Sequence, residues 1–181
     1  MLHAKIINSS IEKIEISRAE NFLKSEKFGA VIYFIGVVRD NNENKKVNGI
    51  TYDAKDTMVI KSFEEIYNET EQKLGIKNKA VFIEHVKGHL KLSEKSILIG
   101  VACKHRDEAY RLSRFIIEEI KKRSPIWKKE HYENEDSKWL KGISLTTWNW
   151  INLNLQKLLL KIFIEIDLSL IHISEPTRPV M

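Results

Sequence analysis

This sequence lacks the features that would place a chain outside the cell or in a membrane. Its 181 residues include one cysteine, Cys103, which excludes an internal disulfide bond and fits a reducing compartment. The residues that follow Met1 have no apolar signal-peptide core, and no uncharged apolar run is long enough to cross a bilayer. We therefore expect a soluble protein of the cytoplasm, with no membrane partner.

Cofactor-binding motifs are missing as well. There is no glycine-rich phosphate loop and no dinucleotide-binding glycine pattern. His85 and His89 flank Gly88, but no further cysteine or carboxylate stands at the spacing of a zinc site. The sequence therefore predicts neither a metal site nor a nucleotide cofactor.

Positive charge, in contrast, is in excess. The formal net charge is +5 and the pI is near 9.1, which is compatible with small anions or nucleic acids as ligands. Net charge bears on association rather than on fold. The length suits one domain, or one domain with an extension.

The most concentrated basic segment runs from Lys121 to Glu130, where five of the nine positions from 121 to 129 are cationic. Pro125 and Trp127 interrupt it, and the proline ends the preceding helix and forces an extended path. We expect two lysine clusters on either side of a bend, facing one volume. They would suit an anionic substrate, or a nucleophilic amine whose pKa is lowered by its neighbours. The alternative is a basic helix end that complements the helix dipole.

The pattern of apolar residues predicts an α+β domain with helices packed on a mainly antiparallel sheet. Runs rich in β-branched and aromatic residues predict strands over residues 4–16, 30–38, 49–54, 80–86 and 96–103. Helices are predicted from a capping box at Ser17 to before Gly29, from a cap at Asp56 or Thr57 to Gly75, and from His105 to Lys121. A polar turn is predicted at Arg39–Asn42.

The composition changes after about Gly142. Residues 143–181 hold only six charged side chains, and no glycine follows Gly142. Alternating apolar residues over 158–173 suit an added strand or a dimer contact, whereas the ending Leu170–Pro179 resembles a translated sequencing adapter. We predict a domain over residues 1–142 and interpret the rest as an atypical apolar extension of frameshift or adapter origin, without a function.

Three further places are candidate sites. Arg39 ends the most hydrophobic strand, where it either reaches a pocket mouth or is a solvated turn residue. His105 and Arg106 begin a helix, whose free N–H groups favour an anion such as phosphate; a plain helix cap is the alternative. Cys103 stands two residues from His105, but a buried, inert cysteine is favoured over a Cys–His nucleophile.

Several segments, taken together, resemble one family. They are Gly29–Val31 with Gly36–Arg39, the His85…Gly88…Leu90 stretch, His105–Ala109 and Pro125–Glu130. In this order and spacing they are similar to the catalytic (large) subunit of molybdopterin synthase, over roughly residues 3–142. Val86 departs from the pattern, because the family usually has an arginine after the histidine.

The resemblance implies an alpha/beta hammerhead-type domain that forms a homodimer. Each copy would bind one small ubiquitin-like sulfur-carrier subunit, giving a heterotetramer. The implied activity is that of a sulfurtransferase in molybdenum cofactor biosynthesis, in which the carrier's C-terminal thiocarboxylate donates sulfur to cyclic pyranopterin monophosphate and the dithiolene of molybdopterin forms. No metal or organic cofactor is implied, because the sulfur arrives on the partner.

The resemblance also implies Lys121 and Lys128 as catalytic residues. Substrate-binding residues are implied at Val37, Val38, Arg39, His105, Arg106, Lys121, Lys128, Lys129 and Glu130. Both substrates are anions, which agrees with the expected clustering of cations. The alternative function is a basic nucleic-acid-binding module that uses Trp127 and the lysines, although no RNA-recognition aromatic pair or helix-turn-helix signal is present.

Overall fold

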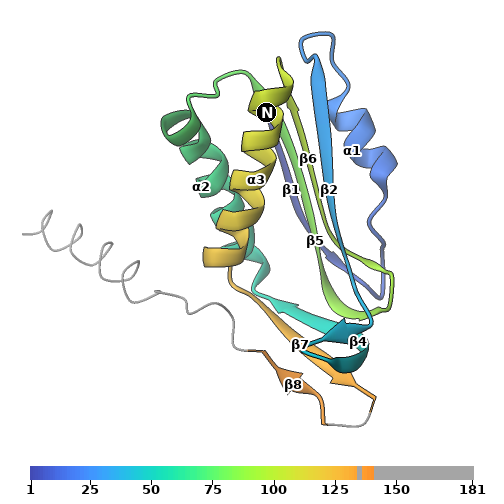
Figure 1. Ribbon diagram of the computed structural model, residues 1–181. Coiled ribbons are helices and arrows are strands. Elements are labelled where there is room, and N and C mark those ends of the chain that lie inside the picture. The colour runs from blue at the N-terminus through green and yellow to red at the C-terminus, as the bar shows by residue number, and fades with distance from the viewer. Residues whose placement is uncertain (134–135, 141–181) are drawn as a thin grey trace, which may run out of the picture. The chain divides into compact units, whose positions relative to one another are not determined.

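The computed structural model describes residues 1–133 and 136–140, which lie in one compact unit. Their elements follow the order β1 (Leu2–Asn8), α1 (Ile16–Leu23), β2 (Ala30–Val37), β3 (Asn41–Asn42), β4 (Lys45–Ala54), α2 (Asp56–Leu74), β5 (Lys79–Lys91), β6 (Lys95–Cys103), α3 (Arg106–Arg123), β7 (Ile126–Tyr132) and β8 (Lys138–Trp139) (Figure 1). The predicted boundary after residue 142 and the extension over residues 143–181 lie outside the described residues.

The strands of the described part form one eight-stranded sheet. Its main order is β2-β6-β5-β4-β7-β8, with β1 beside β5 and β3 beside β4. The β1–β5 pair is parallel, and the other pairs of described strands are antiparallel. The predicted α+β class, with helices on a mainly antiparallel sheet, is confirmed.

Helices cover both faces of the sheet, α2 and α3 on one face and α1 on the other (Figure 1). Side chains alternate along β5, so that Val81 and Ile83 pack into the core beneath α2 and α3, whereas Phe82 packs into the core beneath α1. Two apolar layers result. Strands buried on both faces explain why the runs over residues 80–86 and 96–103 are almost continuously apolar.

Two of the predicted helix caps are wrong. The first helix begins at Ile16, so Ser17 lies within its first turn instead of capping it. The second begins at Asp56 after an extended Lys55, which makes no side-chain cap. The third helix begins as predicted, with His105 at its N-cap position.

Several strand boundaries differ from those predicted. β1 occupies Leu2–Asn8 rather than residues 4–16, and β4 begins at Lys45. The strand predicted over residues 80–86 continues through Gly88, which pairs with Tyr52 of β4. Gly88 has a φ of 102°, which an L side chain rarely adopts. This glycine lies where β5 changes its partner from β6 to β4.

A buried ion pair fastens α1 to the sheet. Glu84 of β5 is fully buried, and Arg18 Nη2 of α1 donates a hydrogen bond to its carboxylate at 2.8 Å. His3 Nε2 lies 3.5 Å from the other carboxylate oxygen. The hydrogen bond to Glu84 raises the pKa of Arg18. Arg18 therefore compensates a carboxylate that would be costly to bury alone.

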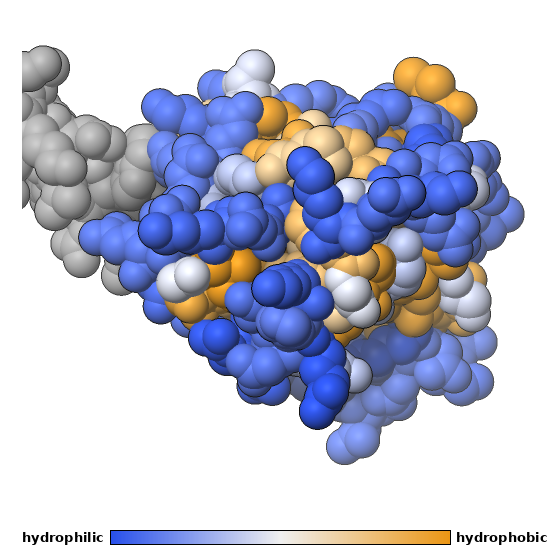
Figure 2. Space-filling model, turned by 90° about the horizontal axis from the view of Figure 1, so that it is seen from above, coloured by the Kyte–Doolittle hydropathy of each residue, from blue (hydrophilic) through white to orange (hydrophobic). Residues whose placement is uncertain are grey.

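No helix in the described part is long and apolar enough to cross a membrane. The end of the molecule that carries the first turn of α3 is seen from above in Figure 2. Hydrophilic residues cover most of this view, and apolar residues show between them in smaller patches (Figure 2).

Candidate active site

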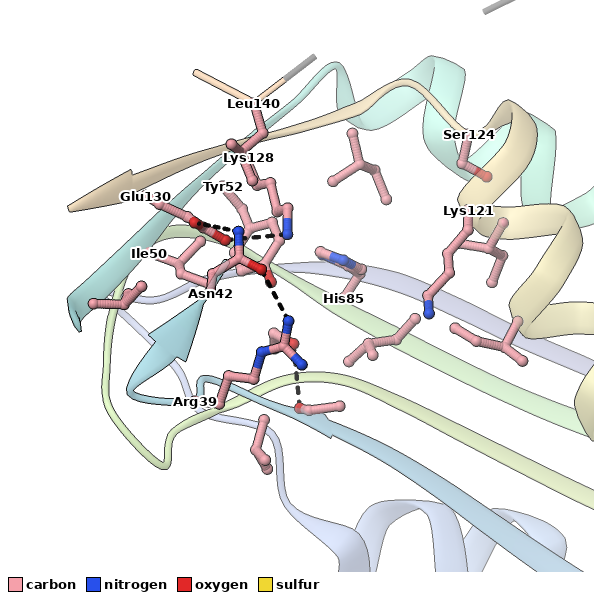
Figure 3. Close-up of a pocket in the computed structure, with 18 of the residues that line it drawn as sticks. Arg39, Asn42, Ile50, Tyr52, His85, Lys121, Ser124, Lys128, Glu130 and Leu140 are labelled. Atoms are coloured by element: carbon pink, nitrogen blue, oxygen red, sulfur yellow. Dashed lines mark hydrogen bonds and ion pairs between the residues drawn. The ribbon is translucent and has the colours of Figure 1, made fainter. Parts of the chain in front are cut away.

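A pocket of about 550 Å³ opens where the C-terminal end of α3 meets strands β2, β4, β5 and β7. Polar side chains from segments far apart in the sequence line it (Figure 3): Arg39, Asn42, His85, Lys121, Lys128 and Glu130. Apolar side chains such as Ile50 and Ile120 complete the wall. The pocket thus gathers three cations around a partly apolar cavity.

The two lysines reach this pocket from either side of a chain reversal. Lys121 lies in the last turn of α3, and the helix ends where Ser124 takes extended backbone angles before Pro125. β7 then pairs with β4, which sets Lys128 opposite Tyr52. Both lysines line the same pocket, so one cation from each side of the proline faces a shared volume, whereas Lys122, Arg123 and Lys129 do not line it.

A buried carboxylate organises the β7 side of the pocket (Figure 3). Glu130 is 2% exposed and accepts hydrogen bonds from Asn42 Nδ2 at 3.0 Å and from the Tyr132 hydroxyl at 2.7 Å. Lys128 Nζ lies 3.3 Å from the same carboxylate. Arg39 donates to Asn42 Oδ1 at 2.9 Å. This chain of contacts connects two of the three cations through one carboxylate and one amide.

The pocket also contains a neutral histidine. His85 is 6% exposed and packs edge-on against Tyr52, with 5.1 Å between the ring centroids. Its Nδ1 lies 2.8 Å from the Val86 carbonyl oxygen, which can only accept, so Nδ1 carries the proton. Burial lowers the pKa of His85 to about 4. The ring is therefore uncharged at neutral pH.

Five of the predicted substrate-binding residues line this pocket: Val37, Arg39, Lys121, Lys128 and Glu130. The other four do not, and two of these are neighbours of residues that do. Val38 is buried in the core beneath α1, and Lys129 places its Nζ 6.0 Å from the centre of the Trp139 ring. The end of β2 and one lysine of β7 therefore reach the cavity, but the predicted neighbours Val38 and Lys129 do not line it.

His105 and Arg106 lie at the opposite end of α3 from Lys121. The helix has 18 residues, and at 1.5 Å per residue its ends are about 27 Å apart. The implied substrate-binding residues His105 and Arg106 therefore do not line the pocket of Lys121 within a single copy of the chain. The separation is fixed by the length of the helix.

Two pocket residues were not predicted as functional. The sequence predicts Asn42 only as a turn residue, and His85 only as a poor zinc ligand. Asn42 reaches the pocket because β3 pairs with β4 beside β7. For His85 a signal exists: a histidine inside the apolar run of residues 80–86 is a buried polar group that needs a partner or a role.

Cys103 is a buried thiol. Burial raises its pKa to about 11, so the reactive thiolate is scarce at neutral pH. The predicted burial of Cys103 is confirmed, and its inertness stays a prediction. Across residues 1–133 and 136–140, no three His, Cys, Asp or Glu side chains are grouped as metal ligands.

Comparisons with known proteins agree with this geometry. The family model described as MoaE protein matches residues 9–123. A molybdopterin synthase catalytic subunit from Synechococcus elongatus is 39% identical over 136 residues, which cover 75% of this chain and 82% of the relative. The X-ray crystal structure of molybdopterin synthase from Staphylococcus aureus is 35% identical, with a TM-score of 0.68 over 75% of this chain and 95% of that chain.

A complex of subunits 1 and 2 of molybdopterin-converting factor from Helicobacter pylori shares the fold, with a TM-score of 0.61 and 23% identity, over 80% of this chain and 92% of that chain. The structure is thus that of an α+β protein with a pocket lined by three cationic side chains. The chain belongs to the MoaE protein family, the family of molybdopterin synthase catalytic subunits, as the sequence resemblance predicted.

Proposed function

We propose that the chain is the catalytic subunit of a molybdopterin synthase and acts as a sulfurtransferase in molybdenum cofactor biosynthesis. The C-terminal thiocarboxylate of a small ubiquitin-like carrier subunit supplies the sulfur, and cyclic pyranopterin monophosphate receives it. The observation that carries the proposal is the convergence of Arg39, Lys121 and Lys128 on one pocket in a chain of this family.

The pocket suits the charges of this reaction. Cations already held in place stabilise negative charge as it develops on carbonyl and phosphate oxygens. The two lysines differ in their surroundings, because Lys128 is paired with Glu130, whereas Lys121 has no hydrogen bond or ion pair with another described residue. Lys128 is thus a positive charge that Glu130 holds in place. Lys121 is the better candidate for moving a proton or transiently accepting an acyl group.

A second copy of the chain supplies the remaining predicted residues. His105 and Arg106 stand at the start of α3, where free N–H groups favour an anion. They lie about 23 Å along the helix from Lys121 of their own chain. They can therefore contribute only to the pocket of the other copy in a homodimer. With two bound carriers this homodimer forms a heterotetramer.

Single-turnover sulfur transfer from a thiocarboxylated carrier to the cyclic pterin tests the proposal. In Lys121→Ala and Lys128→Ala the rate should fall about 10²–10⁴-fold, as for positioned acid–base or nucleophilic groups. Carrier binding and thermal unfolding should stay close to wild type. Lys129→Ala is the matched control, because it removes the adjacent lysine of β7, which does not line the pocket.

Arginine variants distinguish a role as a fixed positive charge from a role in proton or acyl transfer. An arginine keeps the positive charge but does not release its proton. Near wild-type rates in both Lys121→Arg and Lys128→Arg would mean that the lysines act only as fixed charges. If wild-type protein forms no dithiolene but binds nucleic acids with a steep salt dependence, the nucleic-acid-binding alternative is favoured instead.

A further inference from the structure

The pocket offers many hydrogen-bond donors but few acceptors that lack a protein partner. Arg39, Lys121 and Lys128 offer donors and no acceptor. The carboxylate of Glu130 already accepts from three side chains, and the amide oxygen of Asn42 accepts from the guanidinium. The acceptors of this network are therefore occupied before any ligand arrives.

The serine hydroxyls of the pocket also have protein partners. Ser96 Oγ donates to the Gly36 carbonyl at 3.2 Å. Ser124 Oγ lies 2.7 Å from Ser62 Oγ, which donates to the Val59 carbonyl. These contacts hold the cavity wall together. They leave the two hydroxyls less suited to orienting a ligand than an acceptor without a partner.

His85 is such an acceptor. Its Nδ1 donates to the Val86 carbonyl, so the second ring nitrogen, Nε2, carries a lone pair. Nε2 has no hydrogen-bond partner among the described residues and is not sealed off from the cavity. The ring lies between Lys128 and Lys121 in the view of Figure 3. Burial holds the pKa of this histidine at about 4, which keeps the lone pair available at neutral pH.

We propose that His85 Nε2 accepts a hydrogen bond from an N–H group of the substrate and so determines specificity for a ligand that joins such a donor to an anion. The inference rests on the proposed function, in which that ligand is cyclic pyranopterin monophosphate. The cations hold the phosphate, and the pterin ring turns an N–H group toward the histidine. His85 contacts the substrate without exchanging a proton with it.

Two variants distinguish the roles of the two ring nitrogens of His85. His85→Asn keeps a donor near the position of Nδ1, and with it the bond to Val86, but has no acceptor at the position of Nε2. His85→Gln can place an oxygen there. We expect the asparagine variant to bind the cyclic pterin about tenfold more weakly, the effect of one lost hydrogen bond, and the glutamine variant to stay closer to wild type.

Inorganic phosphate serves as the matched probe, because it has the anionic group without the pterin ring. Its affinity should be the same for wild type and His85→Asn, and lower for Arg39→Ala. In long-range ¹H–¹⁵N spectra of the wild-type protein, the His85 ring should show the neutral Nδ1–H form. Its Nε2 signal should move when the cyclic pterin is added, a change that a purely structural role does not produce.

The outcomes are distinguishable. If wild type transfers sulfur while His85→Asn binds the pterin as tightly as wild type does, or the Nε2 signal stays fixed at saturating pterin, this inference is overturned and the proposed function stands. Equal losses of phosphate and pterin affinity in His85→Asn also overturn it, since the cavity itself would then be damaged. If wild type neither binds nor converts the pterin, both the inference and the proposed function are wrong.

Discussion

The buried ring of His85 should make the fold less stable in acid. The pKa of this buried ring is lowered from 6.5 to about 4 by desolvation. Between these values the unfolded chain binds a proton at His85 and the folded chain does not. The stability that depends on the neutral ring is therefore complete above about pH 6.5 and is lost as the pH falls toward 4.

The size of the effect follows from the same two values. Each tenfold difference in proton affinity corresponds to about 1.36 kcal/mol, so the loss from this residue reaches about 3 kcal/mol by pH 4. That is a large part of the stability of an ordinary domain, which is about 5–15 kcal/mol.

Urea unfolding of wild type and His85→Asn at a series of pH values between 7 and 4 measures this difference. Carboxylates such as Glu69, whose pKa is lowered by Arg123, also lose stabilising charge in acid, but they do so in both proteins. The free energy of unfolding should therefore fall more steeply for wild type than for the variant. Parallel curves would refute the reasoning, because His85 would then take up its proton as readily in the folded as in the unfolded chain.

Three other predictions concern the rest of the chain. Arg18→Ala should lower the free energy of unfolding by about 3–5 kcal/mol, because it leaves the buried Glu84 without its arginine and with only His3 beside it. The exposed ion pair of Arg111 should be worth less than about 1 kcal/mol in the matched alanine variant, and equal losses in urea unfolding would contradict this. The thiol of Cys103, with its pKa raised to about 11, should resist iodoacetamide at pH 8 until urea unfolds the chain, and rapid labelling of native protein would show that it is accessible. Deletion of residues 143–181 should leave a folded and active protein, and the interpretation of that segment as functionless fails if the shortened chain is insoluble or inactive.

Local chemistry made parts of the fold predictable from the sequence. The third helix follows from its apolar periodicity, and Gly75 ends the second helix with a φ of 72°, as a C-terminal glycine should. Pro125 predicts that the chain leaves helical geometry between Lys121 and Lys128. These features depend on neighbours within a few residues.

The rest of the site depends on pairings between distant segments. Asn42 meets Glu130 only because β4 pairs with both β3 and β7. Val38 packs into the core although its neighbour Val37 lines the pocket. The alternation of side chains along the chain and a register shift at the end of β2 give it this orientation. Propensity and spacing carry no information about such registers, so the sequence predicts the cations of the pocket better than the groups that hold them.

The length of α3 has a consequence that would be seen in mixtures of variants. In the proposed dimer, one helix contributes Lys121 to its own pocket and Arg106 to the pocket of the other copy. When an Arg106→Ala chain pairs with a Lys121→Ala chain, both defects fall in one pocket and the other pocket keeps its full set of residues. Two inactive proteins, dissociated and reassembled together, would then regain activity that neither has alone.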